Sequence, residues 1–149
     1  RRQNGELQAI LLTRDLEGYA PLDYWYQCWD ELDYRLRQNM IRASAALVAR
    51  LHASKAVHFS LYPKHVFLKP LPDGMGARFI DLEKLRLQHF SRGGFQRDLE
   101  AINRRRKEPS RTQRLRFLLS YLGKERVDAE VRRWVARVLK RSARKNKGR

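Results

Sequence analysis

The chain has 149 residues, and its hydrophobic and aromatic fractions of 42% and 10% are those of a folded domain, which excludes an intrinsically disordered protein. No apolar run approaches the ~18 residues that span a bilayer, and no secretory signal pattern opens the sequence. A chain of this length is expected to be one domain or part of one. The single cysteine, Cys28, excludes an intramolecular disulfide and fits a reducing compartment, so we expect the protein in the cytoplasm.

Positive charge is concentrated in the last third of the chain, which has a net charge of +17 overall. Residues 1–100 hold 15 Lys and Arg against 12 Asp and Glu, whereas residues 101–149 hold 18 against 4, a local excess of +14. Such a field attracts phosphorylated glycans, anionic lipid surfaces or nucleic acid. The alternative explanation is a solvated helix face followed by a frayed basic tail.

A strand and a long helical region are the first predicted elements. Glu6–Thr13 is a short apolar run typical of a strand. Residues 22–40 are predicted to form an amphipathic helix, because apolar side chains recur there at spacings of three and four. A second helix is expected after a break near Arg37–Gln38, and it should end near Ala53–Ala56.

A β-hairpin is predicted after the helical region. The loop "VHFSLYPKH" leads into a strand at residues 66–69, and the second strand covers residues 77–82. The turn between them is predicted at residues 70–76, where two prolines and two glycines interrupt regular structure.

Helices are predicted for most of the remaining chain. The first is Phe95–Arg106, the second is opened by Pro109–Ser110 and stopped by Gly123, and the third is amphipathic over residues 127–141. Residues 142–149 are expected to be a disordered basic tail. The predicted fold class is therefore mainly α with a small β-hairpin, an α+β protein.

The order of these elements resembles the C-terminal lobe of a protein-kinase-like fold. The kinase catalytic loop has the form H-R-D-x-x-x-x-N and is followed by a hairpin and then D-F-G. The stretch "HFSLYPKH" has the same length, with His58, Ser60 and His65 in the positions of the His, the Asp and the Asn. The sequence "DLE" at residues 81–83 stands where D-F-G is expected.

The segments "LYPKHVFL", "FIDLEK" and "RLRFLLSYLG" resemble the lipopolysaccharide kinase (Kdo/WaaP) family, in particular its InaA-type branch. The resemblance implies ATP- and Mg²⁺-dependent phosphorylation of a sugar of the lipopolysaccharide core, at the inner membrane surface. Residues 1–141 would form the kinase-like lobe, with a hinge region at residues 11–21. Nothing here reads as the Gly-rich loop or strand lysine of an N-terminal lobe, so we expect this chain alone to be inactive.

The resemblance also implies roles around the catalytic-like loop at residues 58–65. Asp81 would hold Mg²⁺ and the nucleotide phosphates, and His65 would be either a second metal ligand or a phosphate contact. Lys64 would contact the transferred phosphate. Ser60 stands where the family has its catalytic acid, and a serine hydroxyl is no base at neutral pH, so the usual mechanism is impaired there. Glu83 or His58 could act as a substitute base, and no spacing selects either of them.

Supporting roles are implied for residues outside the loop centre. The hinge would offer backbone groups to an adenine edge at Leu12, Thr13 and Leu16. His58 and Asp98 would brace the backbone of the catalytic-like loop, as the corresponding residues do in kinase-like lobes. Phe59 replaces the arginine that pairs with a phosphorylated activation loop, so control by that route is not expected.

Several alternatives stay open from the sequence. Asp81 could cap the next helix, Asp98 could be an N-cap, and His65 could be purely structural, while His52 has no recognisable partner. The loss of the acid at Ser60 favours a pseudokinase that binds nucleotide or a partner. A binder of anionic surfaces or nucleic acid is the third hypothesis. Nucleic acid is disfavoured because aromatic residues are not interleaved with the basic stretch.

Overall fold

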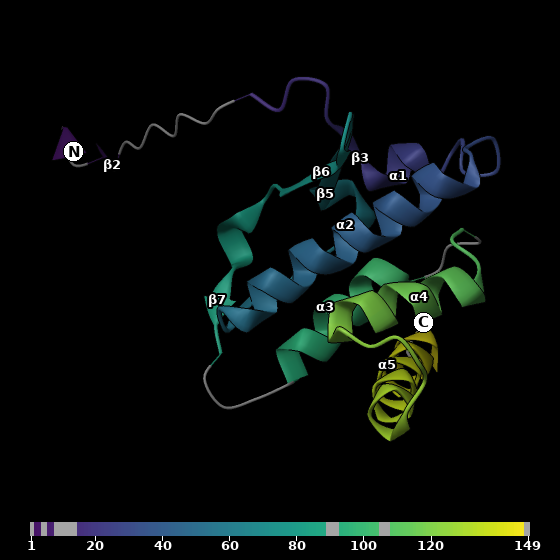
Figure 1. The fold of residues 1–149 in the computed structure, drawn as a ribbon. Coiled ribbons are helices and arrows are strands. Elements are labelled where there is room, and N and C mark those ends of the chain that lie inside the picture. Colours follow the sequence, from purple (N-terminus) through teal and green to yellow (C-terminus); the bar gives the residue numbers. More distant parts are fainter. Residues whose placement is uncertain (1, 4–5, 8–14, 89–92, 105–107, 148–149) are drawn as a thin grey trace.

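The computed structural model describes residues 2–3, 6–7, 15–88, 93–104 and 108–147 (Figure 1). A long central helix lies between a small β-sheet and the helices of the C-terminal part of the chain. Within the described residues, no helix combines the length and the apolar character that crossing a bilayer would require.

The start of the chain contains two paired strands. Strand β1 (Arg2–Gln3) is antiparallel to β2 (Glu6–Leu7). The predicted strand Glu6–Thr13 begins at the expected residue, and residues 8–14 lie outside the described residues. The hinge residues Leu12 and Thr13 are therefore also outside them.

The predicted helix over residues 22–40 is wrong in its boundaries. The structure has a four-residue helix α1 (Leu22–Trp25), then turns, then α2 (Tyr34–Ala53). Asp33 is the N-cap of α2, and its Oδ1 accepts a hydrogen bond of 2.8 Å from the backbone N–H of Leu36. A side-chain cap of this kind starts a new helix, although the apolar spacing continues across the interruption. The predicted end of the second helix near Ala53–Ala56 is confirmed.

The sheet consists of β3 (Ala20–Pro21), β5 (Val66–Leu71) and β6 (Gly74–Phe79) in the antiparallel order β3-β5-β6. The predicted hairpin is confirmed, but its turn is tighter than residues 70–76. Only residues 72–73 lie between the strands.

Pro70 continues strand β5 instead of ending it, as its partner Met75 in β6 shows. The residues of β5 that pair with β3 are Phe67 and Leu68, so Pro70 lies beyond the part of β5 that has a strand on both sides. A missing backbone N–H is tolerated at such an edge.

A second, smaller strand pairing brings together the two chain segments that precede and follow the hairpin. Strand β4 (Ala56–Val57) pairs with β7 (Arg86–Leu87), one on each side of the hairpin in the sequence. The short 3₁₀ helices η1 (Pro63–His65) and η2 (Leu82–Lys84) lie in these two connections. The pairing therefore brings residues 58–65 close to the end of β6.

Helices α3 (Gly93–Asn103), α4 (Arg111–Leu122) and α5 (Ala129–Lys147) complete the fold. Helix α4 has the boundaries that its capping residues predict. Ser110 forms a reciprocal capping box at its start, and Gly123 ends it in the left-handed conformation with φ +64°.

The tail expected to be disordered at residues 142–149 is helical as far as Lys147. Arg, Lys and Ala are strong helix formers, and positive charge is favourable near the negative C-terminal end of a helix. We expected a frayed tail because the charge of these residues was considered without their helix propensity.

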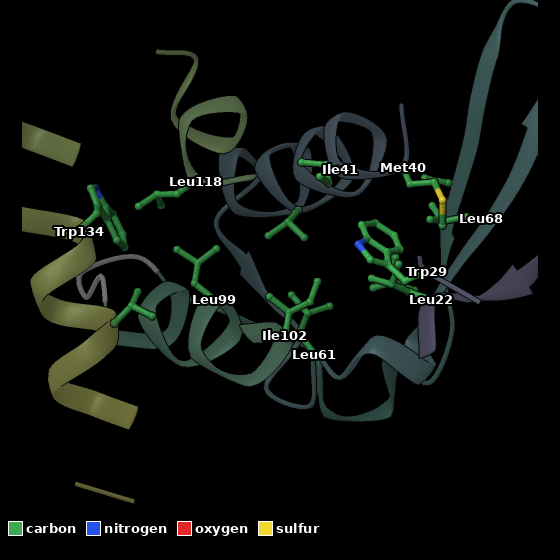
Figure 2. Close-up of a cluster of buried hydrophobic side chains, with 14 of the residues drawn as sticks. Leu22, Trp29, Met40, Ile41, Leu61, Leu68, Leu99, Ile102, Leu118 and Trp134 are labelled. Atoms are coloured by element: carbon green, nitrogen blue, oxygen red, sulfur yellow. The ribbon is translucent and has the colours of Figure 1, made fainter. Parts of the chain in front are cut away.

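The hydrophobic core lies between α2 and the helices α3, α4 and α5, and it extends to the sheet (Figure 2). Trp29 and Trp134 are buried at opposite ends of it, and Leu61 joins the catalytic-like loop to it. Trp25 packs against the core, and Cys28 is half-buried. The loop at residues 58–65 is thus anchored on a rigid interior.

Candidate functional site

The loop at residues 58–65 is held by one buried carboxylate. Asp98 lies in the middle of α3 and is fully buried. Its Oδ2 accepts a hydrogen bond of 2.7 Å from the backbone N–H of His58, and its Oδ1 accepts one of 2.9 Å from that of Phe59. Phe59 has φ +63°, a conformation that is rare for a bulky residue and persists only where its surroundings enforce it. The N-cap alternative for Asp98 is wrong, because the residue lies within the helix.

His52 and Tyr121 extend this support, and sequence reasoning missed both. His52 Nε2 lies 3.2 Å from Asp98 Oδ2, and its Nδ1 lies 2.8 Å from the Tyr121 hydroxyl oxygen. A neutral imidazole fits both contacts when Nε2–H donates to the carboxylate and Nδ1 accepts from the hydroxyl. The available signal was that His52 follows Val48 on the apolar stripe of α2, where a polar side chain must have partners.

Two hydrogen bonds fasten the loop to the end of β6. His58 is fully buried, and its Nε2–H donates to the carbonyl of Ile80 over 3.1 Å. In return, the backbone N–H of Ile80 donates to the carbonyl of His65 over 3.1 Å. Asp81 follows Ile80 directly, so its position depends on the loop.

The structure brings His65 and Asp81 together. His65 is buried, and its Nδ1 lies 2.7 Å from the Ser60 carbonyl oxygen. A carbonyl only accepts, so Nδ1 carries the proton. The opposite nitrogen, Nε2, lies 3.3 Å from Asp81 Oδ2. Either a second proton, on Nε2, or a cation that both atoms bind satisfies this contact.

Asp81 itself is accessible to a ligand. Its side chain is 38% exposed, and its backbone is left-handed with φ +58°. The alternative role as a helix cap is not seen, because the Asp81 side chain makes no capping bond to η2. Asp tolerates the left-handed region better than most residues, so the tight turn after β6 fits this side chain.

The remaining predicted site residues have these positions. Ser60 is buried, and its carbonyl accepts from both His65 and the backbone N–H of Tyr62. Lys64 is exposed on η1, near the end of the loop and just before β5. Leu16 lies in a turn in which its backbone N–H donates to the Asp15 carboxylate over 2.7 Å. Within the described part of the chain, no three metal-ligating side chains cluster, so this chain offers two ligands at most from this pair.

Two arginines lie over the aromatic rings of the loop, Arg97 in α3 and Arg104 directly after its end, and the sequence did not reveal them. The Arg97 guanidinium is 5.1 Å from the centroid of the Phe59 ring, and that of Arg104 is 5.8 Å from the Tyr62 ring. Arg104 also forms two hydrogen bonds, of 2.8 and 2.6 Å, with the fully buried carboxylate of Glu100, which raises the pKa of Arg104. Two guanidinium groups therefore cover the aromatic rings of the loop, and that of Arg104 is neutralised by Glu100.

A second feature is a large apolar cavity within the helical part. Its volume is about 610 Å³, and its wall includes the buried hydroxyl of Ser44. That hydroxyl has no hydrogen-bond partner among the described residues. Arg111 and Arg114 line the cavity at the start of α4. Apolar side chains form most of the remaining wall, among them Trp29, Met40, Ile41, Leu99, Leu118 and Val138.

The model of the lipopolysaccharide kinase (Kdo/WaaP) family matches residues 1–121. The chain belongs to this family. The resemblance seen in its loop and hairpin segments is thereby confirmed, and the family is named for lipopolysaccharide kinases.

Two relatives place the chain more closely. Protein InaA of Escherichia coli (strain K12) is 32% identical over 84 residues, which are 55% of this chain and 38% of InaA. The solved structure of WaaP in complex with acyl carrier protein matches with a TM-score of 0.74 and 26% identity, covering 90% of this chain and 58% of WaaP. The matched regions thus cover less than two thirds of the length of either relative, 38% of InaA and 58% of WaaP. The predicted fold class, mainly α with a hairpin in a kinase-like lobe, is confirmed.

Proposed function

We propose that the complete protein transfers a phosphoryl group from ATP to a sugar hydroxyl of the lipopolysaccharide core. The observation that carries the proposal is the pair formed by His65 and Asp81, 3.3 Å apart at the junction of loop and hairpin. Family membership supports the same chemistry. Phosphoryl transfer needs little covalent work from the protein, and it depends on positioning and on charge neutralisation.

Each residue of the site has a defined task in this proposal. Asp81 and His65 would hold Mg²⁺, which supplies neutralising charge to the nucleotide phosphates when it is bound. Lys64, which precedes His65 in the sequence and is exposed, would contact the transferred phosphate. Asp98 holds the loop in the required conformation through the N–H groups of His58 and Phe59. The hinge segment that includes Leu12, Thr13 and Leu16 would receive the adenine.

Ser60 supports the alternative that the protein is a pseudokinase. The residue occupies the position of the acid that orients the acceptor hydroxyl, and its carbonyl is already engaged by His65. A protein with this change would keep nucleotide binding through Asp81 and lose transfer.

Phosphate transfer to purified lipopolysaccharide core by the full-length protein separates the two functions. Labelled product that disappears in Asp81→Asn supports the kinase. Nucleotide binding without product supports the pseudokinase, and product that appears only in Ser60→Asp would identify the lost acid as the cause. The control is Asp73→Asn, which removes an exposed carboxylate in the turn of the hairpin.

A second candidate function is binding of an acyl carrier protein. WaaP is known in a complex with this carrier, and the cavity of about 610 Å³ in this chain has an apolar wall suited to an acyl chain. The test compares binding of acylated and unacylated carrier to the full-length protein. Val138→Trp, which fills the cavity, should weaken binding of the acylated form, whereas Val127→Trp at an exposed position should not. Equal binding of both carrier forms would contradict this function.

The basic face of α5 would direct the protein to its anionic acceptor at the inner membrane surface. Arg132, Arg133, Arg137 and Lys140 are all exposed on this helix. Binding to vesicles with anionic lipid should weaken steeply with salt and with substitution of these residues by Gln. Binding that is unaffected by either change would remove α5 from the proposal.

A further inference from the structure

The orientation of the His65 ring is fixed by contacts on both sides. Nδ1–H donates to the Ser60 carbonyl over 2.7 Å, and the ring is stacked with that of His58 at a centroid distance of 5.7 Å. The backbone is held as well, since the N–H of His65 donates to Tyr62 and its carbonyl accepts from Ile80. In the neutral ring, the lone pair on Nε2 therefore points toward the Asp81 carboxylate.

The separation of 3.3 Å between His65 Nε2 and Asp81 Oδ2 is the spacing of two ligands on one ion. Bonds of about 2.1 Å place neighbouring ligands ~3.0 Å apart around an octahedral ion and ~3.4 Å apart around a tetrahedral one. The half-exposed carboxylate leaves the remaining positions open to phosphate oxygens and water. The pair can thus bind a metal ion without moving the loop.

The nature of the ligands decides which ion fits. Mg²⁺ prefers oxygen, and the kinase motif offers an amide oxygen where this chain has His65. Imidazole nitrogen binds first-row transition ions far better than Mg²⁺, and a carboxylate suits Mn²⁺ as well. A buried ring whose proton is fixed on the far nitrogen presents only nitrogen to the site.

We infer that the pair of His65 and Asp81 selects a divalent first-row transition ion, with Mn²⁺ as its probe, over Mg²⁺ in the nucleotide complex. This inference rests on the proposed nucleotide site. His65 is then the ligand that determines metal specificity. Because it stands where the kinase motif has asparagine, this replacement changes which metal ion the site prefers. The Ser60 carbonyl acts as the positioning group that sets the tautomer.

The His65→Asn variant is a matched test of this role. The amide of Asn reaches the place of Nδ1 and keeps a donor for the Ser60 carbonyl, but it has no atom at the place of Nε2. Mn²⁺ and Mg²⁺ binding are measured by calorimetry on the full-length protein with a non-hydrolysable ATP analogue. The preference for Mn²⁺, corrected for that of the free nucleotide, should fall at least about tenfold in the variant, on the scale of losses seen when a metal site is disturbed.

Pulsed electron paramagnetic resonance gives an independent readout. Mn²⁺ bound to the wild type should show coupling to an imidazole nitrogen, and this signal tests ligation by His65 even if the variant fails to fold. An equal preference in wild type and variant, or no nitrogen coupling, would overturn this inference and leave the nucleotide site standing. Folded wild type that binds the analogue with neither ion would overturn the proposed function and this inference together.

Discussion

Replacement of Asp98 by asparagine tests the support of the catalytic-like loop most severely. The carboxylate accepts from the backbone N–H groups of His58 and Phe59 and from His52 Nε2, and it is fully buried. Asparagine has one acceptor oxygen, and its NH₂ group faces at least one of these N–H donors, with which it cannot form a hydrogen bond. The Asp98→Asn protein thus keeps the shape of the side chain and loses its charge.

The expected cost follows from the bonds that are lost. A hydrogen bond to a charged group contributes ~1.5–3 kcal/mol, and a buried donor left without a partner costs ~1–3 kcal/mol. Since the oxygen at the Oδ2 position can still serve two donors, we expect Asp98→Asn to lower the free energy of unfolding by about 2–4 kcal/mol. That is a large part of the ~5–15 kcal/mol typical of a native domain.

Urea denaturation measures this cost, and amide hydrogen exchange at His58 and Phe59 shows whether the loss begins at the loop. The control Asp73→Asn removes an exposed carboxylate and should change the free energy of unfolding by no more than about 0.5 kcal/mol. An Asp98→Asn protein as stable as this control, with unchanged exchange at both amides, would refute the assigned role of the carboxylate.

Other predictions concern neighbouring contacts. Tyr121→Phe removes the donor to His52 and should cost about 1 kcal/mol in urea denaturation; no change would mean that the contact adds nothing. Ser110→Ala removes the cap of α4 and should also cost about 1 kcal/mol in thermal unfolding, with Ser110→Gly costing less. The backbone N–H of Val131 donates to the Asp128 carboxylate and lowers the pKa of Asp128. At pH values above the ordinary carboxyl range this contact stabilises the start of α5, and it is lost as the pH falls through the lowered pKa. The protection factor of the Val131 amide, in which the intrinsic pH dependence of exchange is divided out, should fall over that range and stay constant in Asp128→Asn.

Local signals in the sequence predicted most of the elements. The turn residues located the hairpin, and Ser110 and Gly123 located both ends of α4. The failures have physical causes. Apolar spacing continued past Asp33, whose capping bond starts α2, and it does not report interruptions of this kind. The tail was judged by charge, although its residues favour a helix that reaches Lys147.

The sequence predicted the site residues that belong to recognisable motifs, but not the contacts between segments that are far apart in the chain. Motif spacing singled out His65 and Asp81, which the fold brings to 3.3 Å. The contacts of His52 with Tyr121 join residues 69 positions apart, and those of Arg97 and Arg104 depend on how α3 crosses the loop. Such pairings follow from tertiary packing, for which a single sequence carries no local signal.

We propose above all that the junction of loop and hairpin binds the phosphates of a nucleotide through Asp81. Calorimetric titration of the full-length protein with ATP tests it most directly, with Mn²⁺ or Mg²⁺ present or absent and with Asp81→Asn beside the wild type. We expect binding that needs a divalent ion and is lost in folded Asp81→Asn. Binding that persists in the variant, or folded wild type that binds no nucleotide with either ion, would contradict it.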